Sequence, residues 1–287
     1  MNSKRNINVK KILIVALFFF IGIISLFCLV LQIGYAVSQK NATIKKTDYV
    51  MSDISGYLNK TELSESEYNF LYMQTGLTKI GIDRALAHGK EGKEKILDIQ
   101  KDFFGKQTIS PDPFAPWVCT DYIKENVTPV YLEDGDIIVT ASTHFSCLRI
   151  GHAGLVTDGK TNRVLQATEY GALSKIGYVT DFTNRINFMV LRPKASSEIK
   201  SQVIQYAKEH LIGLPYNVFV GANYKQNEIK ESQCAHIVWF AYHKFGYELL
   251  DKKKTFVLPY DLANSDKVEL VQVFGFDLNL LWNKIMF

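Results

Sequence analysis

The residues best suited to chemistry in this chain are a cysteine and a histidine that lie far apart in the sequence. Cys234 opens the stretch ESQCAHIVWFAYHKFGYELL, whose apolar and aromatic residues predict a buried helix. At the first turn of a helix, unpaired N–H groups and the helix dipole favour negative charge. We therefore expect a lowered pKa for the Cys234 thiol, which would make it a nucleophile. A buried core cysteine is the alternative interpretation.

His152 is the candidate base for this thiol. It begins the apolar stretch HAGLVTDG, which predicts a strand, and Gly151 and Gly154 allow another segment to approach closely. A single histidine in a strand is more often structural, so the assignment depends on a third residue. Gln166 in the next predicted strand could accept the second imidazole N–H and fix the tautomer. Glu169 is the alternative third member, but it faces the opposite side of a regular strand.

The elements that must position these residues follow from two periodicities. Period-two stretches predict strands at DGDIIVTAS, HAGLVTDG, RVLQATEYG and INFMVLRP, with a hairpin at DGKTNR. Helical spacing predicts helices over 63–76, 78–89, 90–105 and 196–213, the first of them with a capping box from Ser64 to Glu67. The order of strands, helix, loop and cysteine helix predicts an α+β domain with an antiparallel sheet. The proline-rich stretch ISPDPFAPWVC is expected to be a linker.

The N-terminal stretch predicts a membrane anchor. No charged residue occurs from Ile12 to Gln39, and about 20 apolar residues suffice to cross a hydrocarbon core of about 30 Å. Four basic residues precede this run, which favours a cytoplasmic N-terminus and an extracytoplasmic remainder. We expect an uncleaved, single-pass anchor in the cell membrane. A cleaved signal peptide is the alternative, because Gly34-Tyr35-Ala36 resembles a small-x-small cleavage site.

These patterns divide the chain into three parts. Residues 1–39 form a basic tail and anchor, residues 40–110 a stalk and a small helical segment, and residues 111–287 the main domain. The 287 residues are 47% hydrophobic and 22% charged, which is typical of a globular protein. The net charge of +4 is mild, and no basic stripe is interleaved with aromatic residues, so nucleic acid is excluded as a partner.

The remaining cysteines and histidines leave two points open. Four cysteines are too few for a disulfide framework, and whether Cys119 pairs with Cys147 stays undecided. His144, Cys147 and His152 form a His-x2-Cys-x4-His pattern, but zinc sites usually have tighter spacing and a fourth ligand. We therefore expect neither a metal ion nor a cofactor.

Several short motifs together resemble the NlpC-type cysteine peptidase superfamily, a papain-like group. They are GDIIV, GHAGLVTDG and VLQA, followed by GLPY, QCAHIVWFAY and YDLANS, and they extend over roughly 134–273. Because His152 precedes Cys234, the order resembles the circularly permuted branch of YiiX and YebB type. Ala235 stands where the family often has serine, and Gln166 stands where it commonly has histidine or an acid.

The resemblance implies a permuted papain-like fold with a Cys-His-Gln triad. Cys234 would attack a carbonyl, His152 would shuttle the proton, and Gln166 would orient His152. Tyr216 and Gln233 would contribute to substrate or oxyanion binding. Outside a bacterial membrane, such enzymes commonly cleave amide bonds in cell-wall peptides. Two alternatives remain: a hydrolase or acyltransferase acting on lipid acyl groups or thioesters, and a catalytically inactive binding module.

Overall fold

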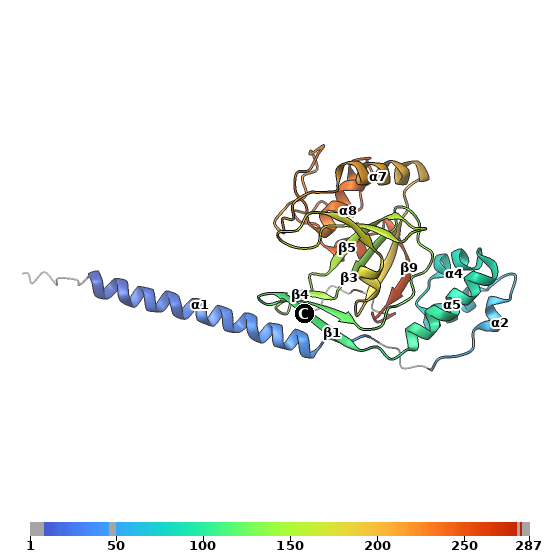
Figure 1. Cartoon of the computed structure of the whole chain (residues 1–287), viewed down its shortest axis with the longest axis horizontal. Coiled ribbons are helices and arrows are strands. Elements are labelled where there is room, and N and C mark those ends of the chain that lie inside the picture. The colour runs from blue at the N-terminus through green and yellow to red at the C-terminus, as the bar shows by residue number, and fades with distance from the viewer. Residues whose placement is uncertain (1–8, 46–49, 280–281, 283–287) are drawn as a thin grey trace, which may run out of the picture.

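A computed structural model describes residues 9–45, 50–279 and 282 of the chain (Figure 1). The first element is the long helix α1 (Val9–Lys40), which Figure 1 shows as a rod leaving the rest of the molecule near β1 and β4. After it come a group of short helices, two antiparallel sheets and the helices that pack on the larger sheet. The α+β class with antiparallel sheets is thereby confirmed.

The larger sheet has six strands in the order β7-β6-β5-β3-β8-β9, and every neighbouring pair is antiparallel. Its inner strands are buried on both faces, which explains why their sequences are nearly continuous apolar runs. The six strands are β3 (Ile137–Thr140), β5 (His152–Asp158), β6 (Arg163–Gln166), β7 (Lys175–Tyr178), β8 (Phe188–Pro193) and β9 (Val268–Phe274).

The predicted cysteine helix is α8 (Cys234–His243), and it packs against β5 and α7 (Ser197–His210). Its residues are buried from Cys234 to Tyr242, as expected for a helix that is apolar on all sides. Figure 1 shows α7 and α8 on the same side of the larger sheet. Two shorter helices complete this part of the molecule, α6 (Thr180–Thr183) and α9 (Pro259–Ala263).

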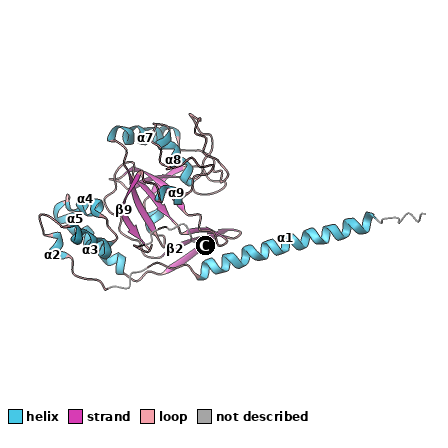
Figure 2. Ribbon diagram, turned by 180° about the vertical axis from the view of Figure 1, so that it is seen from behind, coloured by secondary structure: helices cyan, strands magenta, loops and turns pink. Residues whose placement is uncertain are grey.

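The small helical segment packs at the β9 edge of the larger sheet (Figure 2). Its α3 begins with the predicted capping box at Ser64 and ends at Gly76, whose φ of 71° favours glycine. The backbone of Thr78 donates to Val271 at 3.1 Å, which ties the segment to β9. Since β9 is separated from β5 by two strands, these contacts lie away from His152. The helices are α2 (Ser55–Leu58), α3 (Glu65–Thr75), α4 (Lys79–Leu86) and α5 (Gly89–Phe104).

The stretch ISPDPFAPWVC is not a linker, contrary to our expectation. It forms β1 (Ile109–Ala115) and the start of β2 (Val118–Ile123), which belong to a second sheet with the order β1-β2-β4. Its third strand is β4 (Thr143–Phe145). Because β1 is an edge strand, it tolerates prolines that lack a donor for the ladder.

The C-terminal turns of α1 dock on this second sheet. The Ser146 hydroxyl donates to the carbonyl of Leu31 at 2.9 Å, and Arg149 donates to the carbonyl of Ser38 at 3.4 Å. A Cβ added at Gly34 would lie 2.3 Å from the Ser146 hydroxyl, so a larger residue here would require Ser146 to shift. Residues 10–27 of α1 are exposed, and the helix is long and apolar enough to cross a membrane.

Candidate active site

The Cys234 thiol lies at the N-terminus of α8, beside the strand that carries His152. Gln233 caps the helix in an extended conformation, and its side-chain oxygen accepts a hydrogen bond from the Ala235 N–H at 2.8 Å. Packing of α8 on β5 brings the Cys234 sulfur within reach of the backbone N–H of Ala153, the residue after His152. Cys234 is 7% exposed and His152 is 5% exposed, so each keeps a small accessible surface.

A chain of hydrogen bonds fixes the His152 ring. The Gln166 side-chain oxygen lies 2.9 Å from His152 Nε2, and the Gln166 nitrogen donates to Asp181 Oδ2 at 2.5 Å. A carboxylate only accepts, so the amide nitrogen faces Asp181 and the amide oxygen faces the imidazole. His152 Nε2 therefore carries the hydrogen, which leaves the lone pair on Nδ1.

Asp181 is a residue that sequence reasoning missed. It lies in the one-turn helix α6, and its carboxylate also accepts from the Tyr178 backbone N–H at 3.2 Å. An acidic residue in the first turn of a helix is ordinarily explained by the helix dipole, so its sequence context carried no separate signal. Glu169, the alternative third member, is exposed in the turn after β6. The contact with His152 Nε2 is made by Gln166 instead.

Two further residues that were not predicted surround the imidazole. Phe182 stacks on the His152 ring with centroids 5.1 Å apart and an interplanar angle of 15°. Arg185 is buried; its Nε donates to the Asp181 carbonyl at 2.7 Å and its Nη1 to the Thr143 hydroxyl at 3.0 Å. Within the described ranges, no carboxylate lies at ion-pair distance from this guanidinium. Its charge acts on both Cys234 and His152.

Burial leaves both members of the pair neutral. It lowers the pKa of His152 to about 3, and the nearby Arg185 charge acts in the same direction. Burial also raises the pKa of Cys234 to about 11, although N–H groups of Ala153 and Ala235 and the Arg185 charge act in the opposite direction. The expected lowering of the thiol pKa is therefore wrong. The start of α8 is buried, and the cost of removing a thiolate from water exceeds the effect of the helix end.

Tyr216 lies beside the thiol, while Gln233 is engaged within the protein. Burial and the neighbouring Cys234 raise the pKa of Tyr216, which keeps its hydroxyl protonated and able to donate. The Gln233 side-chain nitrogen donates to the Val257 carbonyl at 2.6 Å, and its oxygen accepts from Ala235 and, at 3.4 Å, from the Cys234 thiol. Gln233 thus holds the start of α8.

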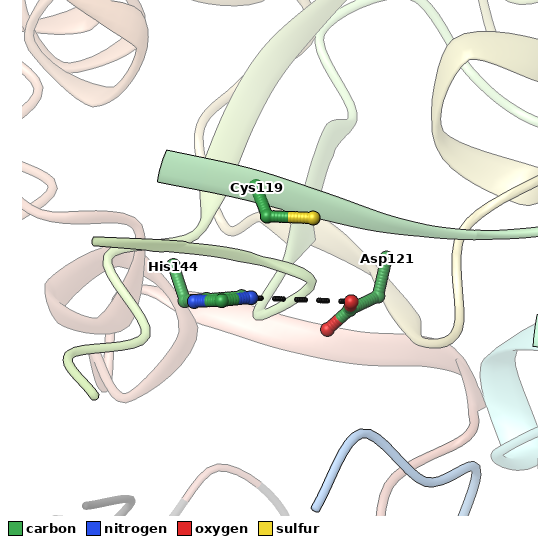
Figure 3. Close-up of side chains that lie close together, drawn as sticks. All are labelled: Cys119, Asp121 and His144. Carbon is green, nitrogen blue, oxygen red and sulfur yellow. Dashed lines mark ion pairs between the residues drawn. The ribbon is translucent and has the colours of Figure 1, made fainter. Parts of the chain in front are cut away.

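The side chains that could bind a metal ion form a different group from the His-x2-Cys-x4-His pattern seen in the sequence. His144 lies with Cys119 and Asp121, all three buried (Figure 3), and not with Cys147 and His152. Cys119 and Cys147 are both free, as are Cys28 and Cys234, so the open question of a disulfide is answered in the negative.

One groove in the described part of the chain lies away from the Cys234 thiol. This groove of about 860 Å³ is lined by α3, the start of α4 and β9, including Tyr68, Tyr72 and Leu270. None of the residues around Cys234 contributes to its lining. Comparison with known proteins adds no identification: no family model matches the chain, and neither does any curated protein or solved structure.

Proposed function

We propose that this protein is a membrane-anchored cysteine hydrolase with a permuted papain-like arrangement, and that Cys234 is its nucleophile. The observation that supports this most strongly is the chain from Asp181 through Gln166 to His152. This chain places the hydrogen on Nε2, so the base in the proposed reaction is the Nδ1 lone pair. The histidine strand packs directly against the helix that opens with the thiol.

In the proposed reaction, both partners start neutral. Sulfur attacks the substrate carbonyl as its proton moves to His152 Nδ1, which forms a tetrahedral oxyanion and an imidazolium. The imidazolium keeps its Nε2–H bond to Gln166, and Arg185 favours negative charge on sulfur. The Tyr216 hydroxyl is a candidate donor to the oxyanion. His152 then returns the proton to the leaving amine, and water cleaves the resulting thioester by the reverse sequence.

The proposed substrate is an amide bond in a cell-wall peptide, as the family resemblance implies. The test is to incubate the full chain in detergent micelles with purified wall fragments and to identify new amino termini by mass spectrometry. We expect cleavage by the wild type and by Cys147→Ser, and none by Cys234→Ser. Cleavage that persists in folded Cys234→Ser would overturn the proposal.

A second substrate class is favoured by apolar residues around the site. The loops that flank Tyr216 are joined by the bridge between Leu173 and Pro215 and by the bond from the Tyr216 N–H to Ala172 at 3.2 Å. Exposed apolar side chains lie on these loops: Tyr170, Leu173, Val218 and Phe219. Such a rim suits an acyl chain better than a polar wall peptide. Faster turnover of lipid esters or acyl thioesters than of wall fragments would select this alternative.

The proposed location is the outer surface of the cell membrane, with α1 as a retained anchor. The part of α1 from Ile12 to Val30 is about 28 Å long, close to the thickness of a hydrocarbon core. Directly after it, the Leu31 carbonyl accepts a hydrogen bond from Ser146, the residue that follows β4. Phe114 of β1 is exposed, as are Leu148 and Ile150 after β4, and these apolar side chains would suit contact with the membrane interface.

A further inference from the structure

Three potential ligand side chains converge on the second sheet (Figure 3). Gln39 of α1 contacts this group. Cys119 and Asp121 are two residues apart on β2, so they share one face of the strand. Cys119 also lies directly opposite His144 of β4 in the antiparallel register. All three side chains are fully buried, and their ligand atoms all lie within 4.8 Å of one another.

Hydrogen bonds on the far side of His144 and Asp121 orient these two side chains so that their other ligand atoms face a common centre. His144 Nδ1 donates to the Ser146 carbonyl at 2.9 Å, which leaves the lone pair on Nε2. Asp121 Oδ2 accepts from Arg149 at 2.9 Å, while Oδ1 faces His144 Nε2 at 4.0 Å. Outer hydrogen bonds of this kind typically orient the ligands of a metal ion.

The side chain of Gln39, from the last turn of α1, reaches into this centre. Its amide nitrogen lies 2.7 Å from His144 Nε2 and 3.2 Å from Asp121 Oδ1, and the Gln39 side chain also hydrogen-bonds to Cys119. Three side chains that carry lone pairs thus surround the amide group. The centre of the cluster is therefore a place that favours positive charge, and turning the amide about its own axis brings its oxygen there.

We propose that Cys119, Asp121 and His144 bind one divalent transition-metal ion, and that the turned amide oxygen of Gln39 completes a tetrahedron. Thiolate, imidazole and oxygen ligands together suit a borderline ion of the zinc class. Binding would release the Cys119 proton to solvent, because the thiolate is the ligand. The donor atoms would move together by about 1 Å to reach bonds of about 2.0–2.3 Å.

This metal site has a structural role, distinct from the proposed hydrolase. Gln39 belongs to α1, whereas the other three ligands belong to the second sheet, so the ion would fasten the anchor to the domain. None of the ligands belongs to the group around Cys234. Binding is thus expected to stabilise the protein and to leave the Cys234 chemistry unchanged.

The test is a cobalt titration of the chelator-treated full chain in detergent micelles. We expect one equivalent of Co²⁺ to bind, with a thiolate-to-cobalt charge-transfer band and the visible bands of tetrahedral coordination, and zinc to displace it. Cys119→Ser should lose the charge-transfer band, and Gln39→Ala should weaken binding about tenfold or more. The matched controls Cys147→Ser and Cys234→Ser should keep the full spectrum, which separates this result from any failure of the hydrolase proposal.

Three results would overturn the metal proposal. They are the absence of stoichiometric binding by the folded wild type, a charge-transfer band that persists in Cys119→Ser, and loss of the spectrum in Cys147→Ser. If Cys119→Ser does not fold, as judged by circular dichroism, the spectrum of the wild type and its change in His144→Gln decide the question.

Discussion

Single residues around Cys234 determine which protonation states are available for catalysis. In many thiol enzymes the cysteine and histidine form an ion pair, but burial disfavours both charges here. The pKa of His152 is lowered to about 3 and that of Cys234 is raised to about 11. Proton transfer must then accompany attack on the carbonyl, and the reactive form of the site is the neutral one.

The first prediction concerns the pH dependence of this neutral pair. His152 gains a proton only as the pH falls toward its lowered pKa, and Cys234 loses one only as the pH rises toward its raised pKa. We expect kcat/KM to be level between about pH 4 and about pH 10. Rates measured in buffers of constant ionic strength check this. An acid limb near the ordinary histidine pKa would show that burial does not keep His152 neutral, and it would contradict this prediction.

The second prediction concerns Asp181 and its indirect action on His152. Asp181→Asn removes the charge that fixes the Gln166 amide, so that this amide can turn and present its nitrogen to the imidazole. We expect kcat to fall about tenfold or more with KM almost unchanged, because only the base is misoriented. Glu169→Gln is the matched control and should change neither value. If both variants changed kcat equally, the proposed role of Asp181 in orienting Gln166 and His152 would be contradicted.

Asp181 also illustrates which parts of a site a sequence can predict. Cys234, His152 and Gln166 stood out because each is polar within an apolar run. Asp181 and Arg185 lie in an ordinary polar stretch after β7, and only packing brings them to His152. The thiol pKa was predicted in the wrong direction because the depth of burial of a helix end depends on its tertiary neighbours.

At the scale of elements, the sequence predicted helix ends correctly where the capping contacts form between residues close in the chain. The capping box at Ser64 and the left-handed Gly76 mark both ends of α3, as their spacing predicted. The stretch 109–119 was misassigned because its prolines are compatible with a strand that pairs on one side only. That pairing depends on β2 and cannot be seen in the stretch itself.

The third prediction compares the caps of two helices. Gln233→Ala removes the bond to the Ala235 N–H and the bond to Val257, whereas Ser64→Ala removes the cap of α3. Each should lower the free energy of unfolding by about 1–2 kcal/mol. Only Gln233→Ala should reduce activity, because only that cap positions Cys234. Denaturant unfolding and initial rates, measured on the same preparations, separate the two effects; activity lost equally in both variants would refute this role for Gln233.

At the scale of the whole molecule, the docking of α1 decides where the domain lies. The helix is bound to the second sheet through Leu31, Ser38 and Gln39, so the domain cannot move far from the end of the helix. If α1 crosses a membrane, the second sheet is held at its surface. The helical segment then lies on the β9 side of the larger sheet, where it contributes to the core and does not cover Cys234.

The fourth prediction concerns topology. Basic residues before the apolar run favour a cytoplasmic N-terminus, so the domain after Lys40 should be accessible from outside. We expect a protease added to intact spheroplasts to degrade the domain, and alkaline carbonate to leave the untreated chain in the membrane fraction. A domain protected until the membrane is permeabilised would place it in the cytoplasm and contradict the proposed location.

The most direct test of the central claim is to trap the acyl-enzyme. The full chain in detergent micelles is mixed with an activated acyl ester and quenched in acid, and the modified cysteine is identified by peptide mass spectrometry. We predict one acyl group on Cys234, formed as fast in Cys147→Ser as in the wild type, and at least about a hundredfold slower in His152→Ala. Acylation spread equally over the thiols, or unaffected by His152→Ala, would contradict the assignment of Cys234 and His152 as nucleophile and base.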